Sequence, residues 1–539
     1  MNDAASTGGV GCIIVPERAD APTAREIAEG ADRSVLTALL DARRTVGGGT
    51  VALEDGDRRT LTYTELVRAA AALSRVIRRA TEAPVVAVML PSSAAAAVAY
   101  FAVLAAGKVP CMVNFTAGAS QCIAACRRAR AGLVITATRF LELAQLEPLA
   151  DALGDAAPVA RLEDMRERVT RRDRLFALLA PALGLLPRSA PDEAAAILFT
   201  SGAEGEPKGV VLTHRNVLAN CEQVRLALPL ERVRVFFNPL PVFHSFGLGP
   251  GMILPLTSGL KLVLHPSPLR TKEVTERIAQ TRANVLLATD TFLRQYARAG
   301  ADGSLSSLQF AVCGAERVRK ETRELVRERF GFVVVEGYGV TETSPVLSAN
   351  HPDDIRDGTV GRLLPGIEAK LEPVPGLPEG ARLSVRGPNV MAGYLDAECN
   401  LVAPPDGWHD TGDVVTFDDG YLMIRGRLKR FAKIGGEMTS LVIVESLAGA
   451  VWPDALHAAV ALPDGRKGER IILLTEQPSP DAGALVRQLR AEQLPERYLP
   501  ARTITVDRIP LLGSGKLDTV AATSLAAERI AAHQAAPGA

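Results

Sequence analysis

The sequence has no excess of either charge. It contains 61 lysines and arginines and 61 aspartates and glutamates, so its formal net charge is +0 at pH 7. Proteins that bind nucleic acid usually present a basic surface, and this composition does not favour a nucleic acid partner. Any charged partner has to be met by a local patch.

The sequence also lacks a hydrophobic run long enough to cross a bilayer. The longest run, Ala94 to Ala106, falls short of the roughly 20 residues that a membrane-spanning helix needs. We expect a buried helix there, after a strand from Val85 to Leu90. The first 30 or so residues lack the charged start and apolar centre of a signal peptide, and we expect residues 1–30 to be poorly ordered. A cytoplasmic protein is predicted.

Cysteine is scarce, and its spacing is not that of a metal site. Cys122 and Cys126 share one helical face, but no histidine or further cysteine lies near them in the sequence. Two such residues are more often part of a core than metal ligands, so we predict no metal site there and a reduced environment. The seven cysteines are Cys12, Cys111, Cys122, Cys126, Cys221, Cys313 and Cys399.

A chain of 539 residues is too long for one core and should form two or three domains. Strand-like and helical runs alternate along most of it, for example a helix over 320–330 followed by a strand over 332–335, which predicts a large α/β body with stacked sheets and helices. After about Gly426 the elements shorten into a small, mobile α+β domain, with helices over 440–450 and 481–492 and strands over 457–462 and 470–474. The predicted domains are 31–428 and 429–539.

The most informative segment runs from Ile197 to Val210, where an apolar strand enters a glycine-rich loop. Glycines let backbone N–H groups turn toward an anion, hydroxyls add donors, and Lys208 adds a positive charge. A plain surface turn is the alternative. The order Lys-Gly and the proline inside the loop disfavour a Walker loop, and no Gly-x-Ser-x-Gly elbow of a hydrolase is present. The predicted nucleotide contacts are Thr200, Ser201, Gly202, Gly205 and Lys208, with Gly209 as the third glycine.

This loop resembles the signature of the adenylate-forming (AMP-binding, acyl-CoA synthetase/luciferase) superfamily, Thr-Ser-Gly-(Ser/Thr)-Thr-Gly-x-Pro-Lys-Gly. It departs from that signature at Ala203 and Glu204, where two hydroxyls are missing and a carboxylate is introduced. The resemblance implies ATP and Mg2+ as cofactors. We expect the loop to rely more than usual on backbone donors and Lys208.

The run Glu336-Gly-Tyr-Gly-Val-Thr-Glu342 is similar to another motif of the family. The resemblance implies adenine stacking by Tyr338, phosphate contact and catalysis by Thr341, and Mg2+ coordination by Glu342 together with Thr200. A hard divalent ion suits these oxygen ligands. The resemblance also places Gly314 and Ala315, with Glu336 and Gly337, beside the adenine.

Three further motifs come later in the chain, in the order that the family shows. The run Trp408 to Asp413 resembles the ribose motif, in which Asp413 accepts both ribose hydroxyls, with Arg427 near the ribose and Lys429 as the hinge. By the same resemblance Lys433, Gly435 and Gly436 line the entry of a thiol. The Gly-Ser-Gly-Lys run ending at Lys516 resembles the mobile catalytic loop, whose lysine bridges the substrate carboxylate and the α-phosphate.

The acyl pocket is indicated by Leu240-Pro-Val-Phe-His-Ser-Phe-Gly-Leu-Gly249, which is similar to the family's aromatic motif, with His244 as the gate. Amino-acid-activating relatives usually carry an aspartate at this place, so an amino acid substrate is disfavoured. The small neighbours Gly247, Gly249 and Gly251 suggest room for a long aliphatic chain.

Within the superfamily, the sequence from about residue 190 is most similar to the ligase half of bacterial 2-acylglycerophosphoethanolamine acyltransferase/acyl-ACP synthetases, without their His/Asp acyltransferase motif. This likeness rests on Phe-His-Ser-Phe-Gly, His265-Pro-Ser-Pro-Leu269, Arg430-Phe-Ala-Lys-Ile434 and Pro510-Leu-Leu-Gly-Ser-Gly-Lys516. It implies that a medium- to long-chain fatty acid is loaded onto the phosphopantetheine thiol of acyl carrier protein. A fatty acid–CoA ligase is the alternative, and Ala203 and Glu204 leave open a nucleotide-binding regulator with weak turnover. The predicted basic dock comprises Arg425, Arg427, Lys429, Arg430 and Lys433.

One segment is not explained by these motifs. The apolar stretch from Leu175 to Leu186 follows Arg171, Arg172 and Arg174, a pattern that suits the surface of an anionic membrane, such as the inner face of a cell membrane. Pro181 and Gly184 are expected to weaken it as a helix, so a packing role is ranked first. Peripheral membrane contact remains the alternative.

Overall fold

The fold is described from a computed structural model. The described residues are 13–15, 24–201, 207–377, 379–435, 437–465, 468–511 and 517–535. The chain divides into two compact units: a larger one of residues 16–368 and 386–409, and a smaller one of residues 1–15, 369–385 and 410–539. We describe each unit by itself.

The larger unit contains a predominantly parallel sheet that supplies half of the site described below. Its central strands β14, β13, β12, β10, β11 and β2 pair in parallel, and antiparallel strands flank them. Parallel strands that are covered by helices on both faces have nearly continuous apolar sequences. Strand β12 is an example, since every one of its residues is buried. The order is β16 (Arg362–Leu363), β15 (Val346–Ala349), β14 (Val333–Gly339), β13 (Phe310–Cys313), β12 (Val285–Ala288), β10 (Val235–Asn238), β11 (Lys261–Leu264), β2 (Val51–Glu54) and β3 (Thr60–Thr62).

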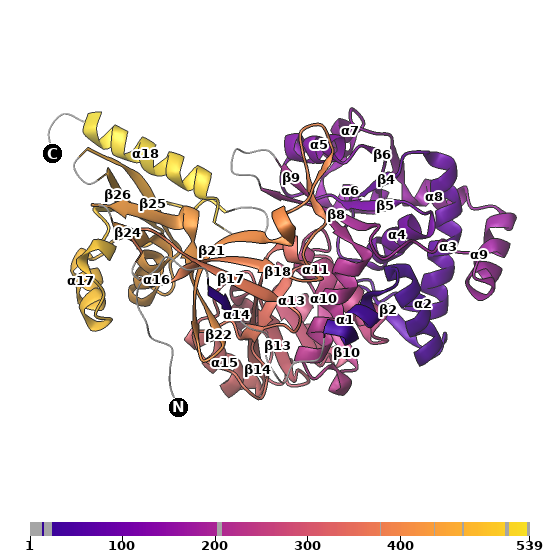
Figure 1. Cartoon of the computed structure of the whole chain (residues 1–539), viewed down its shortest axis with the longest axis horizontal. Helices are drawn as coiled ribbons and strands as arrows, with labels where there is room; N and C mark the ends of the chain where they lie inside the picture. Colours follow the sequence, from indigo (N-terminus) through magenta and orange to yellow (C-terminus); the bar gives the residue numbers. More distant parts are fainter. Residues whose placement is uncertain are drawn as a thin grey trace. The chain divides into compact units, whose positions relative to one another are not determined.

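A second sheet of the larger unit carries the glycine-rich hairpin at β8 and β9 (Figure 1). Its parallel part is β8, β5, β4, β6 and β7, whereas β9, β19 and β20 are added in antiparallel fashion. The order is β20 (Leu401–Val402), β19 (Gly393–Leu395), β9 (Pro207–Thr213), β8 (Ala194–Ser201), β5 (Val109–Met112), β4 (Val85–Val88), β6 (Ala131–Thr136) and β7 (Val159–Arg161).

The helices of the larger unit follow from their capping residues and apolar patterns. Thr62 and Glu65 form a capping box at the start of α3, and α4 is an alanine-rich helix buried on nearly all sides, as predicted for 94–106. The helices are α1 (Ala24–Ala31), α2 (Val35–Val46), α3 (Tyr63–Ala80), α4 (Ala94–Ala105), α5 (Ala119–Arg128), α6 (Thr138–Ala144), α7 (Glu147–Leu153), α8 (Leu162–Glu167), α9 (Arg171–Leu183), α10 (His214–Ala227), α11 (Ser245–Leu248), α12 (Leu254–Thr257), α13 (Thr271–Thr281), α14 (Asp290–Ala299) and α15 (Lys320–Phe330), with short turns η1 (Leu230–Arg232), η2 (Gly249–Ile253), η3 (Thr341–Thr343) and η4 (Pro405–Gly407).

The segment from Leu175 to Leu186 corrects one expectation. Helix α9 forms in spite of Pro181, which lies in the last turn, and Gly184 ends the helix with a φ of 66° rather than weakening it. A left-handed glycine after the last turn is the usual way to satisfy terminal carbonyl groups. Thr170 and Asp173 form a capping box at the start of the helix.

The smaller unit combines an antiparallel ribbon with a compact α+β body. The ribbon strands, which lie mostly in this unit, are β1 (Ile13–Val15), β17 (Glu368–Pro373), β18 (Ala381–Arg386), β21 (His409–Asp418) and β22 (Tyr421–Arg427). The body is formed by β24 (Glu437–Ser440), β23 (Phe431–Ile434), β26 (Gly468–Thr475), β25 (His457–Asp464) and β27 (Arg502–Thr505), with α16 (Leu441–Val451), α17 (Ala482–Ala491), α18 (Thr519–Ala535), η5 (Leu428–Arg430) and η6 (Glu496–Tyr498).

The structure confirms the predicted α/β class, with large sheets and covering helices. Among the described residues, we find no helix with the length and apolar character that a membrane span requires. Cys122 and Cys126 are core residues of the second sheet's cluster, where burial raises their thiol pKa values to about 11 and about 12.

Candidate active site

The hairpin of β8 and β9 contains Thr200, Ser201 and Lys208 at one end of the second sheet. Thr200 lies opposite Lys208 in the antiparallel register, and Ser201 opposite Pro207. Lys208 is exposed and Thr200 is half-buried. The hairpin therefore holds a hydroxyl before the glycine-rich loop and a cation after it, opposite each other in the two strands. The predicted contacts Gly202 and Gly205, like Ala203 and Glu204, lie outside the described residues.

The third glycine of this segment has a packing role. A Cβ atom on Gly209 would lie 3.0 Å from Leu395 Cδ1 and 3.1 Å from Phe199 Cε1. These distances are tighter than ordinary van der Waals contact, so Gly209 allows β9 to pack closely between two apolar side chains. Its absence of a side chain is explained without a ligand.

Tyr394 connects the hairpin to the predicted Mg2+ ligand. It lies on β19, next to β9, and its ring centroid is 5.2 Å from Lys208 Nζ. Its hydroxyl donates to Glu342 Oε1 at 2.7 Å. An ammonium over a tyrosine ring is attracted by the negative face of the ring, and a phenol is a good donor to a carboxylate. Tyr394 thus holds two predicted site residues at once, and the sequence analysis missed it.

Thr341 is brought to the predicted acyl gate. Its Oγ1 lies 3.2 Å from Ser245 Oγ, and Ser245 directly follows the half-buried His244. The ring of His244 lies 4.7 Å from that of Phe243, which also contacts Phe115 at 4.8 Å. The gate is therefore backed by an aromatic cluster, and the predicted phosphate-binding threonine is beside it.

The predicted adenine walls meet where parallel strands β13 and β14 end. A Cβ on Gly314 would lie 3.4 Å from the Phe246 ring and 3.6 Å from the Gly337 carbonyl oxygen. Ala315 follows with a φ of 69° and is exposed, and Tyr338 is half-buried on β14. Ligands of α/β proteins commonly bind at the carboxyl ends of parallel strands. The structure therefore gathers the predicted adenine-contacting residues at the edge of the sheet where such ligands bind; they are Gly314, Ala315, Gly337 and Tyr338.

Glu336 supports this edge from inside the protein. The side chain is buried, accepts from Val318 N at 2.9 Å and pairs with Arg323. Burial raises the pKa of its carboxyl group, against the opposing effect of the hydrogen bond from Val318 and the charge of Arg323. Both carboxylate oxygens have protein partners, which fasten the segment after β13 to β14. The observed contacts are those of a positioning residue.

In the smaller unit, Asp413 and Arg427 form the predicted pair. They lie opposite each other on β21 and β22, and Arg427 Nε is 3.2 Å from Asp413 Oδ1. Asp413 is buried and its backbone N–H donates to Thr411 Oγ1 at 3.1 Å. Arg427 is exposed. Such a pair presents a fixed carboxylate beside a cation.

The predicted hinge and thiol-entry residues follow this pair. Lys429, Lys433 and Gly435 are exposed, whereas Gly436 lies outside the described residues, as does Lys516. The hinge, thiol-entry and catalytic roles of these residues stay predictions.

Arg430 does not belong to the predicted basic dock. It pairs with Glu445 and donates to the Ala459 carbonyl at 3.0 Å, so its charge is used inside the body of the smaller unit. Burial raises the pKa of Glu445, and the arginine opposes this effect. Arg425, Arg427, Lys429 and Lys433 remain exposed, and the dock is smaller than the sequence suggested by one cation.

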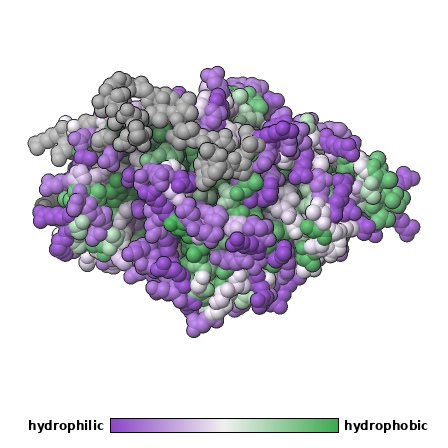
Figure 2. All heavy atoms as spheres, turned by 60° about the horizontal axis from the view of Figure 1, so that its bottom comes forward, coloured by the Kyte–Doolittle hydropathy of each residue, from purple (hydrophilic) through white to green (hydrophobic). Residues whose placement is uncertain are grey.

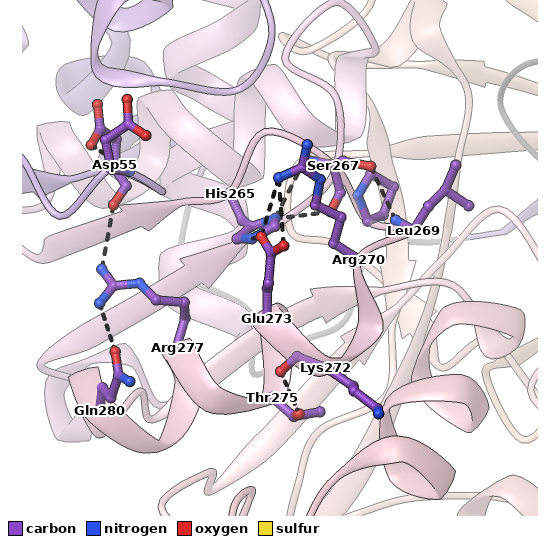
Figure 3. A network of polar contacts seen from close by, with 12 residues as sticks. Asp55, His265, Ser267, Leu269, Arg270, Lys272, Glu273, Thr275, Arg277 and Gln280 are labelled. Carbon is purple, nitrogen blue, oxygen red and sulfur yellow. Dashed lines mark hydrogen bonds and ion pairs between the residues drawn. The ribbon is translucent and has the colours of Figure 1, made fainter. Parts of the chain in front are cut away.

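The His265 motif lies in a polar network beside α13 (Figure 3). His265 is buried, with Nδ1 2.8 Å from the Ser267 carbonyl oxygen and Nε2 3.6 Å from Glu273. Burial lowers the pKa of its imidazole. In the same view, Arg277 donates to the Asp55 carbonyl at 3.3 Å. The motif shapes a loop after β11, which gives it a structural role.

The three glycines near the acyl gate do not create space for a chain. A Cβ on Gly247 would lie 2.1 Å from the Pro241 carbonyl oxygen, one on Gly249 2.9 Å from that of Ser344, and one on Gly251 2.4 Å from Asn238 Nδ2. Protein atoms already fill these places. The interpretation of these glycines as room for an aliphatic chain is therefore wrong, because they serve close backbone packing.

Comparison with known proteins shows the family to which the chain belongs. The model of the family described as AMP-binding enzyme matches residues 40–395, more than half of the chain. The chain belongs to the AMP-binding enzyme family. Among curated relatives, this family member is 32% identical to the medium-chain fatty-acid–CoA ligase of Escherichia coli K12 over 347 residues, 60% of each chain. The match thus spans about three fifths of that relative's length.

Two further likenesses extend over most of the chain. The protein is 30% identical to 2-hydroxy-7-methoxy-5-methyl-1-naphthoate–CoA ligase of Streptomyces carzinostaticus over 520 residues, 90% of this chain and 92% of the relative. Its structure resembles that of O-succinylbenzoate coenzyme A synthetase from Bacillus subtilis in complex with ATP and magnesium ion, with a TM-score of 0.77, 23% identity, and coverage of 90% of this chain and 99% of that one. The structural likeness supports the fold.

Proposed function

We propose that this family member is an acid–thiol ligase, which uses ATP and Mg2+ to convert a fatty acid into an acyl-adenylate and then transfers the acyl group to the thiol of coenzyme A. The observation that carries the proposal is the arrangement of Lys208, Tyr394 and Glu342, with Thr341 beside the acyl gate. It offers a cation for phosphate and a carboxylate for a metal ion within one unit.

The residues present fit a nucleotide with its metal ion. Mg2+ usually binds one or two carboxylates together with the phosphates of its substrate, and Glu342 supplies such a carboxylate. Thr200, Thr341 and Lys208 supply donors to phosphate oxygens. Mg2+ would neutralise charge that builds on the phosphates. Glu336 would act on the adenine only indirectly, through the segment that it fastens.

The adenylation step needs charge stabilisation more than a nucleophilic side chain. A substrate carboxylate oxygen attacks the α-phosphorus, a new O–P bond forms, and the bond to the pyrophosphate leaving group breaks. Lys208 and Lys516 are proposed to stabilise the negative charge of this transition state. Asp413 is proposed to accept the ribose hydroxyls, because an ionised carboxylate has two acceptor oxygens.

The second step transfers the acyl group. The thiol loses its proton to solvent, its sulfur attacks the acyl carbon of the adenylate, a C–S bond forms, and AMP leaves with the electrons of the former C–O bond. We propose that Lys433 and Gly435 line the thiol's path and that the smaller unit pivots at Lys429 between the two steps.

The acceptor and the acid are proposed from the relatives and from the altered dock. The two curated relatives described above are named as CoA ligases, and the predicted dock for an acidic carrier protein loses Arg430 to Glu445. A fatty acid is favoured by one of these relatives, whereas the other is named for an aromatic acid. Acyl carrier protein stays the competing acceptor that the experiment has to include.

A product assay tests the proposal. The full chain is incubated with ATP, Mg2+, saturated fatty acids from octanoic to octadecanoic acid and an aromatic acid, with coenzyme A and holo acyl carrier protein in competition, and products are identified by mass spectrometry. Acyl-CoA of a fatty acid is expected. Acyl carrier protein as the main product would overturn the acceptor, and an aromatic thioester would overturn the acid.

Matched variants separate the enzyme from a regulator that only binds nucleotide. Lys516→Ala and Glu342→Gln are each expected to lower fatty-acid-dependent pyrophosphate exchange by about a hundredfold or more, as for loss of one preorganised charge. Glu398→Gln changes an exposed carboxylate elsewhere in the larger unit and is expected to behave as wild type. Nucleotide binding without pyrophosphate release would instead show a regulator.

A further inference from the structure

Helix α9 exposes its large apolar side chains and buries its small ones. Its inner face consists of Asp173, Ala177, Ala180 and Pro181, and it packs on α3. A surface helix of a globular protein normally shows the opposite pattern, with its apolar stripe toward the core. The outward residues of α9 and the turn after it are Leu175, Leu178, Leu179, Leu183 and Leu185, with exposed fractions of 57%, 48%, 43%, 64% and 59%.

These five residues form a patch on the surface, which we call the leucine face. In Figure 2 hydrophobic surface gathers at the right-hand end of the molecule, the end that α9 occupies in Figure 1. Scattered exposed leucines are normal, but a continuous apolar patch marks a surface for interaction. The five leucines lie within three turns of one helix and its cap, so they can meet a partner together.

Polar contacts hold the helix in this orientation. Arg79 donates twice to the buried Asp173, at 2.9 and 2.8 Å, and Asp173 caps the helix with Thr170. The Arg75 guanidinium lies 5.0 Å from the centre of the Phe176 ring. Because the bonds from Arg79 join α9 to α3, α9 cannot turn its leucines inward without breaking this ion pair. The leucine face is therefore built into the fold.

The surroundings of the leucine face are basic. Between Arg168 and Asp192 the sequence contains a single carboxylate, Asp173, whose charge is used by Arg79. Arginines on the same stretch are exposed; they are Arg168, Arg171, Arg172, Arg174 and Arg188. A chain with no net charge thus carries several positive charges on the segment that contains the leucine face.

We propose that the leucine face docks on an anionic lipid surface. The leucines would enter the boundary between headgroups and acyl chains, and the arginines would meet lipid phosphates. Apolar insertion and attraction to anionic headgroups are the two terms that bind an interfacial helix, and both are present on α9. The charge favours an anionic surface over a neutral one. This surface property goes beyond the proposed catalytic function and does not depend on it.

Vesicle co-sedimentation of the full chain tests this proposal without relying on activity. The probes are vesicles of phosphatidylcholine alone and of phosphatidylcholine with about one quarter phosphatidylglycerol. We expect binding to the anionic vesicles, at least about tenfold stronger than to neutral ones, and weaker at high salt because screening reduces the attraction. Absence of binding to anionic vesicles would overturn the proposal.

Two variants and their controls locate the binding surface. Leu175→Gln/Leu179→Gln and Arg171→Gln/Arg172→Gln are each expected to weaken vesicle binding by about tenfold or more. Leu143→Gln changes an exposed leucine on α6, and Arg68→Gln/Arg327→Gln removes two exposed arginines from α3 and α15; both controls are expected to bind as wild type. Circular dichroism and thermal unfolding check that every variant is folded.

The same variants distinguish a lipid surface from a second copy of the chain. If the leucine face pairs two copies, sedimentation velocity shows a dimer that Leu175→Gln/Leu179→Gln converts to a monomer, with vesicle binding unchanged. That result would overturn the proposal. Equal vesicle binding by the α9 variants and by wild type would do so as well.

Discussion

Tyr394→Phe isolates the one bond by which Tyr394 positions Glu342. The substitution removes the hydroxyl that donates to Glu342 Oε1 at 2.7 Å and keeps the ring that lies 5.2 Å from Lys208 Nζ. Because phenylalanine has the same ring and nearly the same volume, the packing of β19 against β9 should persist. Any change in the Mg2+ dependence of the rate then shows how much the hydrogen bond from Tyr394 contributes to holding the Glu342 carboxylate in position.

The size of the effect follows from the kind of bond. A hydrogen bond to a charged group contributes about 1.5–3 kcal/mol. Since Glu342 and Tyr394 are half-buried, water compensates part of the loss and the lower end applies. About 1.4 kcal/mol in the transition state corresponds to about a tenfold change in rate. We therefore expect kcat/KM for MgATP in pyrophosphate exchange to fall about tenfold, with a higher Mg2+ concentration needed for half the maximal rate.

Tyr296→Phe serves as the matched control. The hydroxyl of Tyr296 donates to the Pro268 carbonyl at 2.8 Å, so the same atom is removed from a bond of similar length that involves no predicted site residue. This variant should lose about 1 kcal/mol of stability and keep the wild-type response to Mg2+. If Tyr394→Phe has wild-type Mg2+ dependence while Glu342→Gln abolishes exchange, Tyr394 does not position the carboxylate and the reasoning is refuted.

Three further predictions concern stability, measured by denaturant unfolding of the full chain. Asp173→Asn should cost about 2–3 kcal/mol at pH 7. Arg79 holds the pKa of the Asp173 carboxyl well below its usual range, so wild type loses this stability as pH falls below about 3.9. The variant has no carboxyl to protonate at this position, and an equal loss of stability in wild type and variant below that pH would contradict this reasoning. His214 is buried, and desolvation lowers the pKa of its imidazole to about 4. As pH falls, the unfolded chain therefore binds a proton at this histidine before the folded chain does, and wild type should lose about 2–3 kcal/mol of unfolding free energy between about pH 6.5 and pH 4. This loss should be absent in His214→Asn. Gly247→Ala should lower the unfolding free energy by about 3 kcal/mol, because the new Cβ would lie 2.1 Å from the Pro241 carbonyl oxygen. The control Gly49→Ala places a Cβ where no atom lies within 4 Å, and it should change stability by less than about 0.5 kcal/mol.

The fold was predictable where the signal is local. The helix expected over 320–330 is observed as Lys320–Phe330, since its pattern and the following glycine lie within one short segment. The strand expected over 332–335 extends instead over Val333–Gly339. Its extra residues pair with β15, and this antiparallel partner stabilises two glycines that have a weak strand preference of their own. Pairing with another segment is information that a local pattern does not contain.

In the site, as in the fold, local motifs could be recognised in the sequence, whereas contacts between distant segments could not. The motifs singled out Thr341 and His244, whose roles stay predictions, and the structure adds that Ser245, next to His244, contacts Thr341 from nearly a hundred residues away. Tyr394 was missed because its role depends on the register of β19 with β9. The internal ion pair of Arg430 was missed for a similar reason, since Glu445 lies on the next helix and faces inward only after packing. Residue types were readable from the sequence, but their partners were not.

Tyr394 also explains how Lys208 and Glu342 can both serve a ligand. A lysine and a glutamate that approach each other directly form an ion pair and satisfy one another. In the part of the chain that the structure describes, no ion pair joins these two residues; the tyrosine ring lies below the ammonium and its hydroxyl binds the carboxylate. The cation and the anion are thus held near each other but apart. MgATP carries both a cation and phosphate anions, so a carboxylate and an ammonium that are not paired with each other can meet both without first breaking an internal salt bridge.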